Sequence, residues 1–231
     1  MASKPVDGLL LIDKPAGMTS HDVVDSVRRR FHTRRVGHGG TLDPAATGLL
    51  ILLLGSATRQ ASRLLGADKS YLATVRLGVS TDTQDAEGRV LETRPVGPVS
   101  LEVLEQACTR FRGEIEQEIP AYSAVRIQGR RSYALARAGL PVPRRSRRVT
   151  IHRLQVLQLR LPDIDLEMIC SKGTYVRTLC ADLGRTLGFG GHLLKLRRTR
   201  IGPFTLEQAV PLAEVGDQHL VPAEILLAGS L

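Results

Sequence analysis

The chain has 231 residues, 42% of them hydrophobic, and a formal net charge of +9 at pH 7. A chain of this length can bury a large core without disulfide support. Its longest apolar run, Leu49 to Leu54, is too short to span a bilayer, and the N-terminus lacks the charged-then-apolar pattern of a signal peptide. We therefore predict a cytoplasmic protein with no membrane partner.

The first predicted elements are a buried strand from Gly8 to Asp13 and a helix that Thr19 caps. Thr19 and Asp22 have capping-box spacing, and the apolar residues that follow repeat with a helical period. The next expected elements are a glycine-rich loop, a second buried strand from Leu49 to Leu54, and a short helix over residues 57–65.

The glycine loop, residues 37–48, contains four glycines and one proline, which exclude a regular helix. Its ionisable groups are His38 and Asp43. Asp followed by Pro is typical of a helix N-terminus, but only four residues separate Pro44 from the next extended run, so at most one turn is capped. From spacing alone, two interpretations of Asp43 are equally favoured: a catalytic carboxylate and a residue of a structural turn.

Downstream of the loop, Lys69 to Gly78 alternates as a half-buried strand, with Tyr71 on the apolar face. The acidic stretch 81–88 fails the spacing of a calcium loop, so we predict no calcium site. Ser100 is expected to cap a helix that ends at Gly113 and has four residues on its buried face. These are Leu101, Leu104, Cys108 and Phe111.

The charge excess lies in one basic segment, because the residues from Arg126 to Arg153 include nine arginines and no acidic residue. Such a concentration of arginine is typical of a surface that binds a polyanion. Within the segment we predict a strand over 123–128, a helix over 132–138, and an extended, exposed arm at 144–148. The alternatives are a solvated loop and a patch that binds a membrane surface. The segment has no long amphipathic apolar face that could enter a bilayer, which disfavours the second alternative.

The second half of the chain is predicted to contain a hairpin, a helix and a strand. The hairpin joins 149–161 to 164–170, the helix runs from about Thr174 to Leu187, and the strand covers Leu193 to Arg200. The three cysteines, Cys108, Cys170 and Cys180, lack C-x-x-C spacing, which favours free, partly buried thiols and makes a zinc site improbable. No phosphate loop, dinucleotide fingerprint or nucleophile elbow is present, so no nucleotide triphosphate or nicotinamide cofactor is expected.

Five motifs occur in an order that resembles the TruB family of bacterial tRNA pseudouridine synthases. They are Asp13-Lys14-Pro15-x-Gly17-x-Thr19-Ser20, Gly37-His38-Gly39-Gly40-Thr41-Leu42-Asp43-Pro44-x-Ala46-Thr47-Gly48, Lys69-x-Tyr71, Ser171-Lys172-Gly173-Thr174-Tyr175-x-Arg177 and Leu196-Arg197-Arg198-Thr199. The resemblance extends from about Gly8 to Val210. It implies a mixed α+β fold, with a curved, mainly antiparallel sheet flanked by helices and an active site in a cleft across it.

The resemblance also implies an activity, the isomerisation of the T-loop uridine at tRNA position 55 by base flipping. Asp43 is then the catalytic aspartate, Arg177 the cation that keeps it ionised, and Tyr71 the ring that stacks on the flipped uracil. His38 would fill the vacated stack in the RNA, while Tyr175 and Lys14 would shape the pocket. Without the resemblance, Arg177 is interpreted as a surface arginine, Tyr71 as a core tyrosine and His38 as a loop histidine bonded to nearby backbone.

The remaining implications concern the partner and the domains. The partner is the tRNA T-arm, held by an arginine set in and beyond the basic segment, and the reaction needs no metal, redox cofactor or energy source. The set is Arg126, Arg130, Arg131, Arg144, Arg145, Arg147, Arg148, Arg197 and Arg198. We expect a monomer with a catalytic domain over 1–210, an RNA-gripping insertion at about 118–150, and a tail over 211–231 in place of a complete C-terminal RNA-binding (PUA) domain.

Two other functions stay open at this stage. The first is a catalytic subunit that depends on a guide RNA, as in archaeal and eukaryotic relatives of the family. The second is an RNA-binding or RNA-folding protein with incidental catalysis. One local departure from the family pattern, at residues 117–124, concerns the path of the chain into the basic segment, because the usual double proline and methionine are absent.

Overall fold

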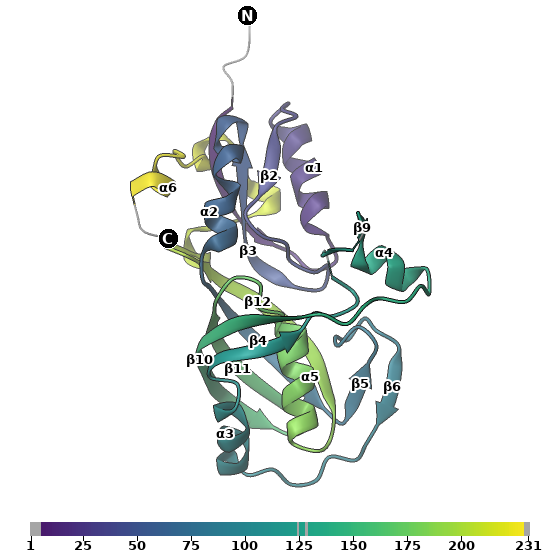
Figure 1. Cartoon of the computed structure of the whole chain (residues 1–231). Helices are drawn as coiled ribbons and strands as arrows, with labels where there is room; N and C mark the ends of the chain where they lie inside the picture. Colours follow the sequence, from purple (N-terminus) through teal and green to yellow (C-terminus); the bar gives the residue numbers. More distant parts are fainter. Residues whose placement is uncertain (1–5, 124, 128, 229–231) are drawn as a thin grey trace, which may run out of the picture. The chain divides into compact units, whose positions relative to one another are not determined.

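The computed structural model describes residues 6–123, 125–127 and 129–228. The chain divides into two compact units, one formed by Met1–Leu72 with Leu196–Leu231 and the other by Ala73–Lys195. Its strands form a large, mostly antiparallel sheet, and helices are few, which confirms the predicted mixed α+β class (Figure 1). The predicted catalytic domain, 1–210, includes parts of both units and stays a prediction.

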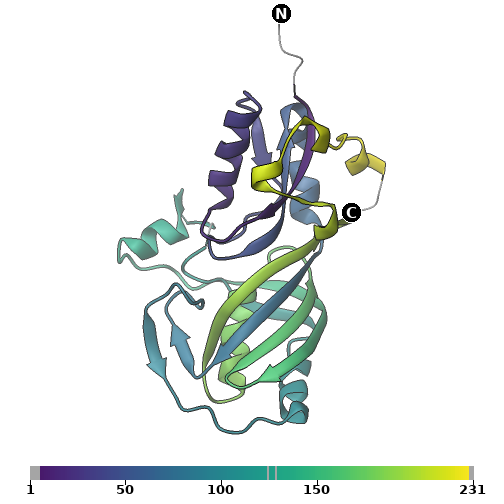
Figure 2. The ribbon, with the colours of Figure 1, turned by 180° about the vertical axis from the view of Figure 1, so that it is seen from behind.

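The first unit is built on two adjacent antiparallel strands, β1 (Gly8–Lys14) and β3 (Thr47–Leu54). β2 (Val36–His38) pairs with β3, and β14 (Val210–Pro211) runs parallel to β1. β12 (Gly191–Ile201) pairs through Arg197 and Arg198 with the start of β3, and then with β13 (Phe204–Thr205). The C-terminal segment also bonds to β1, where Leu9 and Val221 exchange main-chain hydrogen bonds (Figure 2).

The leucine-rich strands are apolar on both faces because both faces are covered. Leu9, Leu11 and the odd-numbered residues of β3 from Leu49 onward pack with α2 (Ala61–Gly66), the short helix before it (η1, Gly55–Gln60) and the C-terminal segment. The even-numbered residues pack instead with α1 (Ser20–Arg30). The predicted capping box is confirmed, since Thr19 and Asp22 bond to each other's main-chain N–H.

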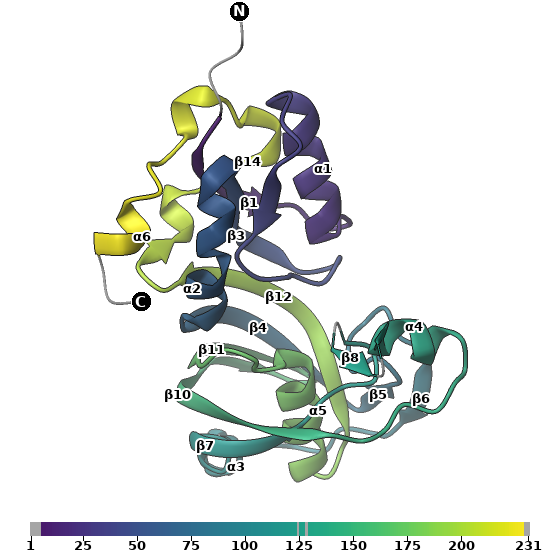
Figure 3. The same ribbon diagram turned by 45° about the horizontal axis from the view of Figure 1, so that its top comes forward.

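The second unit contains the antiparallel strands β7 (Gly113–Glu118), β10 (Ser146–Arg160) and β11 (Asp163–Cys170) in the spatial order β11-β10-β7. Helix α5 (Val176–Thr186) buries an apolar stripe against this sheet (Figures 1 and 3). α3 (Leu101–Thr109) packs against β10. β4 (Lys69–Leu77) begins in the first unit and ends in the second.

The remaining elements are short. In the second unit they are two small hairpins, β5 (Val79–Thr81) with β6 (Val90–Thr93) and β8 (Arg126–Ile127) with β9 (Arg130–Arg131), and α4 (Ser132–Arg137). In the first they are the turns η2 (Leu206–Gln208), η3 (Leu212–Glu214) and η4 (Asp217–His219), and α6 (Ile225–Ala228).

Several predicted boundaries need correction. Leu101 is 52% exposed because it opens α3 on its solvent side, and α3 ends at Thr109, so Gly113 instead begins β7. β10 begins at Ser146, which places Arg147 and Arg148 in the sheet rather than in an arm. The strand predicted over 123–128 is only Arg126–Ile127, and Ala124 and Gln128 lie outside the described residues. The three cysteines are thiols, as predicted, but they are completely buried rather than partly buried.

Gly48 provides a test of how tightly β3 and β12 approach. It lies opposite Arg198 with φ +97°, and a Cβ there would lie 2.3 Å from the main-chain oxygen of Arg198. Gly17 has a similar φ of +82° but open space around it. We expect Gly17→Ala to cost about 1 kcal/mol through backbone strain alone. Gly48→Ala should cost at least about 2 kcal/mol more, because backbone atoms must move.

Urea unfolding of both variants measures this difference. Equal losses of stability in the two variants would contradict the close approach of β12 to Gly48.

Candidate functional site

Asp43 begins a single tight turn in the glycine loop. Its main-chain oxygen accepts a hydrogen bond from the Ala46 N–H at 3.1 Å, and β3 starts at Thr47, so no helix follows. The side chain of Asp43 is partly buried, while Leu42 and Ala46 beside it are buried. The alternative of Asp43 as a helix cap is therefore excluded, and a partly covered carboxylate stands on a turn fixed from both sides.

Lys14 holds the turn from the side of β1. Its side chain is completely buried, and Nζ donates to the main-chain oxygens of Pro15 at 2.8 Å, Met18 at 2.7 Å and Pro44 at 3.1 Å. Pro44 also accepts a hydrogen bond from the Gly17 N–H. The buried ammonium group thus ties the residue after Asp43 to the turn that follows β1.

Arg198 holds the other side of the loop. Only 1% of it is exposed, and its guanidinium donates to the main-chain oxygens of Leu49 at 2.8 Å, Thr41 at 3.3 Å and Gly40 at 3.0 Å. This burial corrects the prediction that Arg198 binds RNA, because its donors serve the loop rather than the surface. Arg197, on the opposite face of β12, is 40% exposed in its side chain and pairs with Asp13 at 2.7 Å.

His38 ends β2 at the entrance to the loop. Its Nδ1 accepts a hydrogen bond from the Gly40 N–H at 3.3 Å, which leaves Nε2 as the protonated nitrogen of the neutral ring. Burial lowers the pKa of His38 below its usual value of 6.5, and the positive charges of Arg198 and His21 act in the same direction. His38 therefore presents a flat, neutral ring at physiological pH.

Tyr71 and Lys69 lie on β4. Tyr71 is 8% exposed and belongs to the buried face that the alternation predicted. Lys69 is also buried and donates to the main-chain oxygens of Leu64, Leu65 and Ala67. It thereby satisfies carbonyl groups at the end of α2, a role that the sequence did not suggest.

Arg177, in the second unit, is buried in the first turn of α5, which excludes the alternative of an ordinary surface arginine. Only 6% of it is exposed, and it donates to the main-chain oxygens of Thr83 and Tyr122, both at 2.8 Å. Its Nε lies 3.7 Å from Oδ2 of Asp85, in the acidic stretch whose spacing excludes a calcium loop. No local pattern indicates that this acidic turn serves an arginine.

Tyr175 precedes α5 and is held by a residue that sequence reasoning missed. The side-chain amide of Gln117 exchanges two hydrogen bonds with the Tyr175 main chain, and the Arg147 guanidinium lies 5.4 Å from the centre of the Tyr175 ring. Gln117 is the single buried residue in a glutamate-rich strand. A contact across 58 residues leaves no local sequence signal.

The basic segment presents most of its arginines on short or exposed elements. Arg126 lies on β8, Arg130 and Arg131 lie on β9, and Arg144 and Arg145 are exposed before β10 begins. Arg148 is exposed on β10, 3.5 Å from Glu114. The predicted helix in this segment is confirmed as α4, which lies beside β8 in Figure 3.

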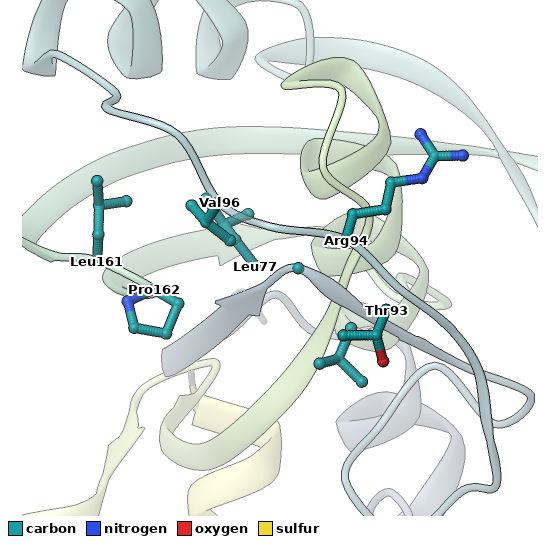
Figure 4. A pocket seen from close by; sticks show the side chains of 8 residues that line it. Leu77, Thr93, Arg94, Val96, Leu161 and Pro162 are labelled. Carbon is teal, nitrogen blue, oxygen red and sulfur yellow. The ribbon is translucent and has the colours of Figure 1, made fainter.

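A pocket of about 370 Å³ lies elsewhere in the second unit, where β4 and β6 meet the turn between β10 and β11 (Figure 4). Leu77, Val96, Leu161 and Pro162 form much of its wall. Of the described residues that line it, Arg94 alone is charged and none is a predicted site residue.

In the described part of the chain, no group of three or more His, Cys, Asp or Glu side chains could hold a metal ion. Of the helices in that same part, none is long and apolar enough to cross a membrane.

Comparisons with known proteins identify relatives over nearly the whole chain. The family model described as TruB family pseudouridylate synthase (N terminal domain) matches residues 28–176, and that of the tRNA pseudouridylate synthase B C-terminal domain matches 177–227. The tRNA pseudouridine synthase B of Aromatoleum aromaticum is 52% identical over 219 residues, which cover 95% of this chain and 70% of that protein. That of Mycobacterium tuberculosis is 50% identical over 215 residues, covering 91% and 72%.

Solved structures agree on the fold. A chain in a Cbf5-Nop10-Gar1 complex is 30% identical, with a TM-score of 0.75, and the match covers 95% of this chain and 61% of that one. A chain in an H/ACA RNP bound to a substrate RNA containing 2′-deoxyuridine is 28% identical, with a TM-score of 0.71 and coverages of 95% and 60%. The chain thus spans about 70% of the curated relatives and about 60% of these structural neighbours.

The lowered pKa of His38 predicts a pH dependence of stability. The unfolded chain takes up a proton on this ring near pH 6.5, whereas the folded chain resists it until a lower pH. The contribution of His38 to stability is therefore complete above about pH 6.5 and is lost as pH falls toward the folded-state pKa. NMR titration of the ring protons should show His38 protonating below its ordinary value.

The free energy of unfolding of the wild type should be lower at pH 5.5 than at pH 7.5. In His38→Gln, which has no ring to protonate, this decrease should be smaller. A normal or raised pKa for the His38 ring would contradict the prediction.

Proposed function

Because the chain belongs to the TruB family of pseudouridylate synthases, we propose that it converts a uridine of tRNA to pseudouridine, and that this uridine lies in the T-loop at position 55. The observation that carries the proposal is the turn of Asp43, clamped by Lys14 and Arg198 within the family's glycine-loop motif. A carboxylate on a fixed main chain suits a reaction that needs one acidic group held at a defined position.

The chemistry needs no co-reactant. The glycosidic bond between N1 and C1′ breaks, a bond between C5 and C1′ forms, C5 loses its proton and N1 gains one, so atoms and electrons balance within the uridine. We propose Asp43 as the residue that enables this exchange, by attacking the sugar or the base or by assisting elimination of uracil. Each of these roles requires the carboxylate in its ionised form.

We propose Arg177 as the cation that favours the ionised form of Asp43. Its own surroundings support a fixed position, since two main-chain carbonyls and Asp85 orient the guanidinium. Tyr71 is proposed to stack on the flipped uracil, with Tyr175 shaping the pocket. Lys14, predicted as a pocket residue, is proposed to act through the loop by holding Pro44.

RNA recognition is assigned to His38 and to arginines outside the core. The neutral, flat ring of His38 suits a group that replaces a flipped base in a stack. Arg197 and seven arginines of the basic segment are proposed to contact phosphates of the T-arm. These seven are Arg126, Arg130, Arg131, Arg144, Arg145, Arg147 and Arg148. We further propose that the chain acts as a monomer in the cytoplasm, where its tRNA substrate is found.

The proposal is tested first at Asp43. Asp43→Asn should abolish pseudouridine formation in an isolated T-arm stem-loop while leaving RNA affinity within about twofold, because the amide keeps the size but not the charge of the carboxylate. Asp25→Asn, at a partly exposed carboxylate that pairs with Arg28, is the control and should stay active. Pseudouridine is mapped in the RNA after incubation with each purified variant.

The same assay separates the alternatives. Undiminished turnover by Asp43→Asn would contradict the role of Asp43. A wild-type chain that binds the T-arm without modifying it would favour an RNA-binding protein, and activity only with an added guide RNA would favour the guide-dependent class. Modification of full-length tRNA but not of the stem-loop would contradict the T-arm as a sufficient substrate.

A salt titration tests the basic segment. Replacing Arg144 and Arg145 with Gln should lower the slope of log affinity against log salt by about 0.7–0.9 for each phosphate that the variant no longer neutralises. Arg153→Gln with Arg160→Gln is a matched double variant on β10, where both arginines pair with carboxylates. This control variant should change the slope less. Equal slopes for the wild type and both double variants would exclude Arg144 and Arg145 from the RNA interface.

A further inference from the structure

Gln117 occupies an unusual position in the second unit. It lies on β7, a strand at the edge of the sheet, between Glu116 and Glu118, and only 1% of it is exposed. A buried side-chain amide must be hydrogen-bonded to offset the loss of water. The partners of this amide therefore indicate what the side chain is for.

Both polar atoms of the amide bind one residue. Nε2 of Gln117 donates to the main-chain oxygen of Tyr175 at 3.0 Å, and the Tyr175 N–H donates to Oε1 at 2.7 Å. This pattern fixes the orientation of the amide, because a flipped group would set donor against donor and acceptor against acceptor. The N–H and the oxygen of Tyr175 are both bonded to one residue of β7, as in a hydrogen-bonded residue pair of two antiparallel strands.

Tyr175 is also the residue from which α5 starts. It is the N-cap of the helix, its side chain makes no capping hydrogen bond, and its oxygen accepts the first helical bond from the Leu179 N–H. Arg177 stands in the first turn that follows. A shift of Tyr175 relative to β7 therefore moves the start of the helix that carries Arg177.

The cross-strand neighbour of Gln117 holds the same tyrosine by its ring. Arg147 pairs with Gln117 in the register of β10 and β7, and its guanidinium lies 5.4 Å from the centre of the Tyr175 ring. The chain leaves the sheet after Glu118 and returns at Ser146, one residue from each of these two positions, and most of the basic segment lies between them. Tyr175 is thus fixed at the base of the segment proposed to grip RNA.

We propose that Gln117 is a positioning residue for the pseudouridylation site, which acts by fixing the Tyr175 main chain and, through it, Tyr175 and Arg177. This inference rests on the proposed function, in which these two residues belong to the active site. Gln117 itself does not touch the reacting atoms.

The test replaces Gln117 by Met, which keeps the length of the side chain and removes both hydrogen bonds. We expect kcat on T-arm RNA to fall at least about tenfold, because small displacements of reacting groups are costly, with the Kd for RNA changed less than about twofold. Amide hydrogen exchange at Tyr175 should become faster. Gln117→Glu, which keeps the acceptor but loses the donor to the Tyr175 oxygen, should also lower kcat.

Thr74→Val is the control for the loss of a hydrogen bond in the same unit. It removes the bond from Thr74 Oγ1 to Asp165, at 2.7 Å, and leaves β7 and α5 untouched, so its kcat should match the wild type. Thermal unfolding shows which variants are folded, and Gln117→Glu provides the kinetic test if Gln117→Met does not fold.

The outcomes separate this inference from the function on which it rests. A wild-type chain that forms no pseudouridine would overturn both. An active wild type together with wild-type kcat in a folded Gln117 variant would overturn the positioning role alone. A loss of kcat in Thr74→Val equal to that in Gln117→Met would do the same, because it would assign the effect to general destabilisation.

Discussion

The guanidinium of Arg198 makes the interaction on which the glycine loop depends. Backbone carbonyls in an irregular loop have no strand or helix partners, and leaving them unpaired in the core would cost free energy comparable to that of a missing hydrogen bond. Arg198 supplies donors to two of them, those of Gly40 and Thr41, and also to the Leu49 carbonyl just after the loop. Its planar guanidinium carries five N–H donors, so one side chain can reach several carbonyls at once. The carboxylate of Asp43 is consequently presented from a main chain with little freedom to move.

The close approach that this interaction requires explains the glycine at position 48. There the strand that carries Arg198 passes so near that any Cβ would overlap its main chain. The glycine-rich composition of the loop thus reflects tight packing at this point rather than flexibility. Lys14 completes the arrangement from the opposite side, since its ammonium holds the Pro44 carbonyl. Two buried cations therefore bracket one short turn, and the order of the loop arises from charge buried among carbonyl dipoles.

Local patterns in the sequence predicted most of the elements. The capping box at Thr19, the alternation through Tyr71 and the hairpin at Pro162 depend on neighbours within a few residues, and all three are confirmed. The side of β12 on which Arg198 lies could not be predicted, because basic residues occur at both odd and even positions of that strand. Gln117 and Asp85 were missed because their partners lie 58 and 92 residues away. Tertiary contacts of this range have no periodicity by which sequence reasoning could find them.

The positions of the basic residues show what a net charge can and cannot indicate. The excess of +9 pointed to a polyanion, yet Lys14, Lys69, Arg177 and Arg198 are buried and donate to main-chain carbonyls. These cations contribute to the folded architecture and not to any surface contact with phosphate. Arg144, Arg145 and Arg148, near the start of β10, are exposed, so their charge reaches solvent. Charge counted from composition therefore predicts the class of partner, whereas only burial separates the arginines that can bind it from those that build the site.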